Sequence, residues 1–157
     1  MRLEYFQLID RIVSFDRAEQ TIRVEARVPT ESTVFEGHFP GLPLMPGVLL
    51  IEAMAQSSGW LLISLNRFTR MPFLAAVKEA KLRTFVTPGQ SLLISAGLVH
   101  EGSGYAVTRA SIEVAGKTVC GAEITFRIVP FPNDSFRASM DNLARSIGFP
   151  VEAALDG

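Results

Sequence analysis

Alternation between apolar and polar residues marks two strands near the N-terminus. The stretch "TIRVEARV" alternates within residues 20–28, and residues 8–15 form a second strand candidate. The segment "FDRAEQ" between them supplies the turn. We therefore predict two short strands before residue 29, followed by a loop rich in proline and glycine over residues 29–47.

A nearly continuous apolar segment predicts one long helix over residues 47–65. Its apolar residues lie almost all round the helical circumference, which is typical of a helix buried inside a protein. The apolar run over residues 42–65, which contains this helix, is the only candidate for a membrane span. Pro46, Glu52 and Gln56 interrupt it, however, and leave no run of ~18 clean apolar residues. We therefore expect no stable membrane insertion.

Four more strands are predicted after this helix. They cover residues 73–82, 91–100, 105–114 and 117–129, and the loops "TPGQ", "HEGSGY" and "AGK" connect them. A helix that is apolar all round, followed by an antiparallel meander, favours a sheet wrapped around a central helix. The predicted fold class is α+β, with residues 1–130 as one domain.

Residues 131–157 are predicted to form a C-terminal extension with a short amphipathic helix. One of Asn133, Asp134 and Ser135 can cap its start, and Gly148 and Pro150 can stop it. An apolar stripe at helical spacing must dock against another surface. Its members are Phe136, Met140, Leu143 and Ile147.

Composition narrows the possible functions. The 157 residues include 15 basic and 16 acidic side chains, so a net charge of −1 gives no reason to expect a nucleic-acid partner. The single cysteine, Cys120, excludes an intrachain disulfide, and the N-terminus lacks a signal-peptide pattern. We therefore expect a cytoplasmic protein. No cluster of cysteine and histidine suggests a metal, and no cofactor is expected.

The stretch "EGHFPGLPLMPGVLLIEAMAQ" carries the candidate chemistry. His38 lies in a loop that its prolines stiffen, and histidine suits general base catalysis near neutral pH. Glu52 lies inside the apolar helix, where a carboxylate is costly unless it is paired or used, and Gln56 one turn later can hydrogen-bond to it. Gly47 begins the helix, so its N–H can bind developing negative charge. Taken singly, His38 is also consistent with an exposed loop histidine that has no function. Glu52 alone is also consistent with a purely structural pair with Gln56.

This stretch resembles the signature of the FabZ type of 3-hydroxyacyl-(acyl-carrier-protein) dehydratases, which have the hotdog fold. The pattern H-F-P-x-x-P-x-x-P-G-V-L-x-x-E-A-x-A-Q is met at every fixed position, and weaker similarity extends over residues 3–129. The resemblance implies that His38 and Glu52 are catalytic and that Gly47 binds the thioester carbonyl. It also implies a cis peptide between His38 and Phe39.

The resemblance further implies partners and an assembly. The substrate would be an acyl chain linked through phosphopantetheine to an acyl carrier protein. Each site would combine the histidine of one subunit with the glutamate of another, in a homodimer or in a hexamer built as a trimer of dimers. A basic rim made by Lys78, Lys81 and Arg83 is one candidate for contact with the acidic carrier protein, and a charge-balanced strand is the equally good alternative.

The resemblance also implies a tunnel that holds the acyl chain, and two further features of the sequence concern this tunnel. Phe73 occupies a position where many members of the family have a gating tyrosine, so it is a possible tunnel residue. We expect the C-terminal helix to dock on the tunnel side and to influence chain length, with the subunit interface as the alternative. Two other functions remain open at this point, a hotdog acyl thioesterase and a non-catalytic acyl-binding hotdog subunit.

Overall fold

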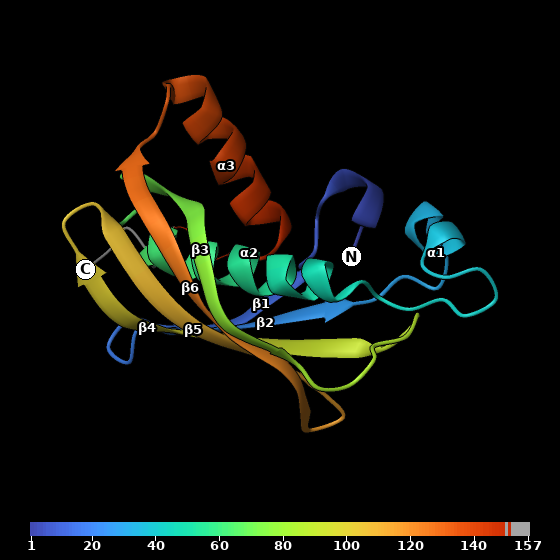
Figure 1. Cartoon of the computed structure of the whole chain (residues 1–157). Helices are drawn as coiled ribbons and strands as arrows, with labels where there is room; N and C mark the ends of the chain where they lie inside the picture. The colour runs from blue at the N-terminus through green and yellow to red at the C-terminus, as the bar shows by residue number, and fades with distance from the viewer. Residues whose placement is uncertain (150, 152–157) are drawn as a thin grey trace.

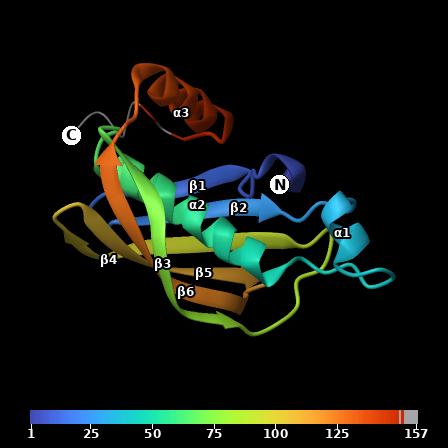
Figure 2. The ribbon, with the colours of Figure 1, turned by 45° about the horizontal axis from the view of Figure 1, so that its top comes forward.

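The computed structural model describes residues 1–149 and 151. A six-stranded antiparallel sheet wraps around one long helix, and a second helix lies on the other side of that helix from β4 and β5 (Figures 1 and 2). The strands are β1 (Arg11–Asp16), β2 (Thr21–Arg27), β3 (Arg70–Leu82), β4 (Ser91–Gly102), β5 (Tyr105–Val114) and β6 (Lys117–Pro130). The helices are η1 (Leu3–Tyr5), α1 (Thr33–Gly37), α2 (Gly47–Leu65) and α3 (Asp134–Ser146). This arrangement confirms the predicted fold.

The sheet order β1-β2-β4-β5-β6-β3 places β3 at one edge. The predicted hairpin between the last two long strands forms with Val114 opposite Lys117. Its turn residues, Ala115 and Gly116, both have positive φ angles, +49° and +77°, which match the twist that two-residue hairpins require. The meander therefore forms as the sequence indicates.

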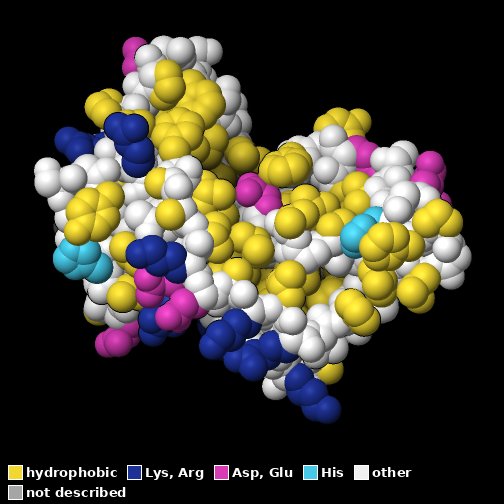
Figure 3. Space-filling model, viewed as in Figure 1, with side chains coloured by type: hydrophobic (Ala, Val, Ile, Leu, Met, Phe, Trp, Pro, Cys, Tyr) yellow, Lys and Arg dark blue, Asp and Glu magenta, His cyan; other side chains and the backbone are white. Residues whose placement is uncertain are grey.

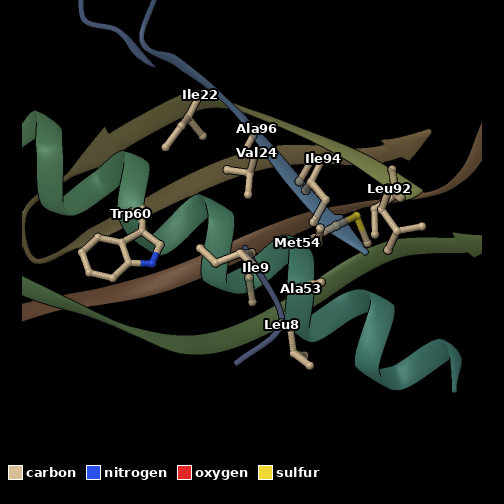
Figure 4. Packing of buried hydrophobic residues seen from close by; sticks show 14 of the residues in the cluster. Leu8, Ile9, Ile22, Val24, Ala53, Met54, Trp60, Leu92, Ile94 and Ala96 are labelled. Atoms are coloured by element: carbon tan, nitrogen blue, oxygen red, sulfur yellow. The ribbon is translucent and has the colours of Figure 1, made fainter. Parts of the chain in front are cut away.

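Helix α2 is the core of the molecule. Alternate residues of the strands, including Val24 and Ile94, point toward its buried residue Met54 (Figure 4). The buried hydroxyl of Thr108 donates to Ser58 Oγ across 2.9 Å, so this polar pair on the sheet–helix interface is satisfied. By length and composition, α2 is the one helix within residues 1–149 and 151 that could span a membrane, but it is mostly buried inside the protein.

The N-terminal third differs from the sequence prediction in two details. β1 begins at Arg11 rather than at residue 8, because Leu8 N–H bonds to the Gln56 side chain instead of a neighbouring strand. The loop predicted over residues 29–47 contains the short helix α1. Ser32 caps α1 by accepting from Val34 N–H across 3.1 Å, a signal that the proline and glycine content of the loop obscures.

The C-terminal helix forms where it was predicted. Asn133 is the capping residue, and its Oδ1 accepts from Phe136 N–H across 2.8 Å. Gly148 has a φ of +68°, a left-handed conformation that suits the end of a helix. Pro150, the second predicted stop signal, lies outside the described residues.

Candidate active site

Backbone hydrogen bonds hold the loop that carries His38 in shape. His38 N–H donates to Val34 O across 3.1 Å, and His38 O accepts from Leu44 N–H across 2.9 Å. Between them, Phe39 and Leu42 exchange two bonds of 2.9 Å each, closing a tight turn around Gly41 at φ +76°. The loop is thus tied to α1 at one end and closed on itself in the middle.

The loop presents His38 and Phe39 together. Their rings lie 3.9 Å apart between centroids, and the peptide bond between them is cis, as the family resemblance implies. His38 is half-buried, whereas Phe39 is 46% exposed. The imidazole is therefore held beside an apolar ring that remains open to a neighbouring molecule.

Glu52 and Gln56 form the pair that their four-residue spacing predicts. Gln56 Nε2 donates to Glu52 Oε1 across 3.1 Å. The same Nε2 donates to Phe6 O across 2.9 Å, and Gln56 Oε1 accepts from Leu8 N–H across 3.1 Å. Gln56 thus fixes the Glu52 carboxylate and ties the N-terminal segment to α2. Sequence reasoning missed Phe6 and Leu8 because they contribute only backbone atoms.

Gly47 is the first residue of α2, after Pro46. Its N–H belongs to the first helical turn, whose amide donors have no intrahelical acceptor. A Cβ atom at this position would lie 2.3 Å from Leu82 Cδ1, so the backbone here approaches β3 more closely than a larger residue allows. A free N–H at a helix N-terminus is suited to binding an oxygen that gains negative charge.

A pocket of about 570 Å³ opens beside Glu52. Its floor is one face of α2, and its walls come from the N-terminal segment, the start of β3 and the second half of α3. Figure 3 shows this hollow beside α3, with largely apolar walls. The lining includes Phe6, Ile9, Trp60, Ile63, Met71, Pro72, Leu74, Phe126, Met140, Leu143 and Ile147. A pocket of this size and character is typical of sites for apolar small molecules.

Four of the six predicted site residues do not line this pocket, namely His38, Phe39, Gly47 and Phe73. His38 and Glu52 therefore do not share this pocket within one chain. Phe73 is 45% exposed and also lies outside the lining, although its neighbours Pro72 and Leu74 contribute to it. The tunnel role of Phe73 stays a prediction.

The one thiol of the chain lies away from this pocket. Cys120 is fully buried in β6, where burial raises the pKa of its thiol to about 11. Cys120 is therefore a small residue of the core. Within residues 1–149 and 151, no group of three or more His, Cys, Asp or Glu side chains could hold a metal ion.

A central helix wrapped by an antiparallel sheet, with a carboxylate on the helix and a histidine in the loop before it, is the arrangement that the resemblance to the hotdog-fold dehydratases implies. The chain belongs to the FabA-like family, whose model matches residues 2–123. It is 42% identical over 122 residues to the 3-hydroxyacyl-(acyl-carrier-protein) dehydratase FabZ of Latilactobacillus sakei, covering 77% of this chain and 86% of the relative. The FabZ of Bartonella quintana is 41% identical over 126 residues, covering 79% of this chain and 81% of the relative.

Solved structures agree on the fold. A dehydratase heterocomplex, ApeI:P, from Xenorhabdus doucetiae aligns with a TM-score of 0.60 at 18% identity, covering 87% of this chain and 90% of that one. A hypothetical thioesterase with coenzyme A from Streptococcus pneumoniae aligns with a TM-score of 0.61 at 18% identity, covering 78% and 90%. At such identities the likeness shows the hotdog fold alone.

Proposed function

We infer that this protein is a hydro-lyase that converts (3R)-3-hydroxyacyl-(acyl-carrier-protein) to the trans-2-enoyl form in fatty acid or lipid biosynthesis. Relatives at 35–42% identity that carry the FabZ dehydratase name span about four-fifths of the chain. The observation that carries the inference is the Glu52 carboxylate, which Gln56 holds in the wall of an apolar pocket.

We propose a division of roles among three groups. His38 removes the proton from the carbon next to the thioester carbonyl, and the negative charge that develops on the carbonyl oxygen is bound by Gly47 N–H. The carbon–oxygen bond at the β-position then breaks, the double bond forms, and the hydroxyl takes up one proton and leaves as water, which balances the proton that His38 removed. Glu52 assists that departure, either directly or through a water molecule. Gln56 and Phe39 support this machinery by orienting Glu52 and packing on His38.

We propose that the working unit is a homodimer in which His38 of one subunit meets Glu52 of the other. Within one chain, His38 does not line the pocket that contains Glu52. The β3 edge of the sheet is long and exposed, and unpaired edges of this kind favour pairing with another chain. The opposite edge is partly occupied, because Ile12 N–H in β1 donates to Ile147 O.

Exposed apolar side chains around β3 support the same assembly. Such clusters on a protein surface mark interaction sites. Those near the start of α2, along β3 and beyond it are Phe39, Leu42, Val48, Phe73, Leu74, Val77, Leu82 and Phe85. A hexamer made of three such dimers is the larger assembly that the family resemblance implies.

We propose that the substrate arrives on an acidic acyl carrier protein, in the cytoplasm. The exposed Lys78, Lys81 and Arg83 lie on β3 and just beyond it, on the same segment as the proposed dimer edge. Cationic side chains at that position complement an acidic carrier protein and speed the encounter.

One assay separates this function from its alternatives. The protein is mixed with a trans-2-enoyl thioester of acyl carrier protein, and the absorbance of the conjugated thioester is followed together with free thiol. Loss of absorbance with no thiol release is expected, because hydration is the reverse of the proposed reaction. Thiol release would identify a thioesterase. No change in either signal, with folded protein and loaded carrier, would identify a non-catalytic acyl-binding subunit.

A further inference from the structure

Helix α3 lies beyond the region that the family model matches, which ends at residue 123. The fold nevertheless anchors it firmly. Phe149, just after α3, packs its ring 5.8 Å from Trp60 and 5.4 Å from Phe68 between centroids. The bond from Ile12 N–H to Ile147 O, 2.9 Å long, ties the end of the helix to β1. α3 is therefore a fixed wall rather than a loose tail.

The lining of the pocket beside α3 extends along α2 from the candidate catalytic carboxylate. Its α2 residues recur at helical spacing on one face, from Glu52 through Gln56 and Gly59 to Ile63. The eleven residue-to-residue steps from Glu52 to Ile63 correspond to roughly 16 Å along the helix axis. Beyond the Glu52–Gln56 pair this face is apolar, and α3 faces it with the apolar side chains of Met140 and Leu143. The extent and character of this lining suit a flexible hydrocarbon chain.

Two charged side chains in the lining other than Glu52, those of Asp10 and Arg2, already have partners within the protein. Asp10 accepts from the N-terminal amine of Met1 and from Arg27 N–H. The Arg2 guanidinium lies 4.0 Å from the centre of the Tyr5 ring. Because both charges already interact with groups of the protein, neither is available to bind a polar ligand. This favours an apolar occupant of the pocket.

We propose that α3 forms one wall of the compartment that takes the acyl chain, and that Met140 and Leu143 set the chain length the enzyme accepts. This inference rests on the proposed dehydratase function, because it assigns the pocket to the distal part of the same thioester substrate. It also implies a functional division of the chain near residue 130, with the catalytic domain before it and a specificity-determining extension after it.

Phenylalanine substitutions on α3 test the proposal. Met140→Phe and Leu143→Phe place a larger side chain in the pocket, whereas Ala138→Phe adds the same ring to an exposed position of α3 outside the lining. The measurement is kcat/KM for a dodecenoyl and for a crotonyl thioester of acyl carrier protein. The ratio of long to short substrate is expected to fall about tenfold or more in the two pocket variants, because hydrophobic pockets discriminate at the level of single methylenes. Ala138→Phe should keep the ratio of the unaltered chain.

Trp60 provides a readout that does not depend on turnover. It is the only tryptophan of the chain, and it lines the pocket. Binding of dodecanoyl carrier protein should change its fluorescence, binding of butyryl carrier protein should not, and Leu143→Phe should weaken the long-chain response. The substitutions introduce no second tryptophan, so the signal stays specific to the pocket.

The two readouts separate failure of the inference from failure of the proposed function. If the unaltered protein is active and both pocket variants keep its ratio of long to short substrate, the role of α3 is overturned. This holds whether their activity is unchanged or falls equally on both substrates. Equal losses accompanied by dissociation into monomers would instead identify α3 as an assembly element. An inactive unaltered chain that still gives the long-chain fluorescence response overturns the dehydratase function but supports the acyl compartment.

Discussion

Gln56 Nε2 donates a hydrogen bond to Glu52 Oε1 across 3.1 Å, one turn back along α2. The direction of this bond is fixed by the rest of the amide. Gln56 Oε1 accepts from Leu8 N–H, so Nε2 must be the atom that faces Glu52 and Phe6 O. One side chain therefore orients the carboxylate and holds the N-terminal segment that walls the pocket.

Replacing Gln56 should reduce both stability and activity. In Gln56→Ala the N–H of the buried Leu8 loses its acceptor, and an unsatisfied buried donor costs about 1–3 kcal/mol of unfolding free energy. Turnover should fall as well, because Glu52 loses the bond that orients it. Urea unfolding and kcat measure the two effects. Gln56→Glu is the companion variant: it keeps an acceptor for Leu8 but places a second carboxylate beside Glu52. Unaltered stability and turnover in Gln56→Ala would contradict the bridging role.

His38→Ala and Glu52→Gln should each lower kcat by at least ~100-fold, the usual contribution of a positioned acid–base group. Both side chains are only half-buried, so circular dichroism and the unfolding midpoint should stay close to those of the unaltered protein. Glu52→Gln preserves side-chain volume and one oxygen acceptor, which makes it a test of the carboxylate itself. Near-normal turnover in either variant would remove that residue from the catalytic assignment.

The two inactive variants should complement each other if the site is shared between subunits. A heterodimer of His38→Ala and Glu52→Gln chains contains one site that lacks both groups and one site with both intact. Mixed dimers should therefore regain about half of the activity per dimer, whereas each variant alone stays inactive. Differently tagged chains establish that subunits have exchanged. Exchange without recovered activity would show that each site is built within one chain.

Periodicity and spacing predicted most of this fold, and they did so where burial is the dominant force. The bounds of α2 agree with the sequence prediction because its apolar residues and the Pro46-Gly47 start leave no alternative. The Glu52–Gln56 pair was also predictable, because helical spacing alone brings the two side chains together. Helix α1 was missed because the proline and glycine content of the loop obscures the Ser32 cap, and because Glu4, which hydrogen-bonds to Ser32, lies 28 residues earlier in the chain.

The residues that form the walls of the pocket were harder to predict from the sequence. The stripe on α3 indicated that the helix must dock, and the tunnel side was the preferred site, but nothing in the sequence fixed its angle against α2. That angle depends on the packing of Phe149 against Trp60 and Phe68, which are more than eighty residues away in the chain. Contacts between distant segments leave no local pattern, so the composition of the pocket became visible only in the structure.

Glu4 should make the start of α1, the helix just before the His38 loop, sensitive to acid. Its carboxylate accepts from the Ser32 hydroxyl across 2.7 Å and from Thr33 N–H across 3.0 Å, and these bonds, that of Ser32 foremost, lower its pKa to about 2. The folded pKa lies below the ordinary value of 4.5, so the stabilisation is complete above that pH and is lost as pH falls toward 2. Unfolding of Glu4→Gln should therefore lack part of the pH dependence between these values. If the unfolding free energies of Glu4→Gln and of the unaltered protein change with pH in the same way between pH 4.5 and 2, the assignment is contradicted.

Gly47 allows a direct test of its backbone N–H as the binder of the thioester carbonyl. Proline removes that single donor, and the first position of a helix tolerates proline well. The preceding residue, Pro46, already has φ −59° and ψ +133°, a conformation compatible with a following proline. Gly47→Ala is the matched control, because both substitutions add a Cβ that displaces Leu82, and only proline removes the N–H.

Gly47→Pro should lower kcat by about 100-fold or more, the usual cost of losing one donor to a developing oxyanion, while Gly47→Ala should lose less than about tenfold. The Leu82 side chain is 52% exposed, so it can move aside for the added carbon. Repeating both substitutions in a Leu82→Ala chain removes the steric contact and leaves the N–H as the only difference. If the alanine and proline variants lose activity equally in that background, the carbonyl is bound elsewhere. Equal activity of the proline and alanine variants in the chain that keeps Leu82 leads to the same conclusion, because turnover would then not depend on the Gly47 N–H.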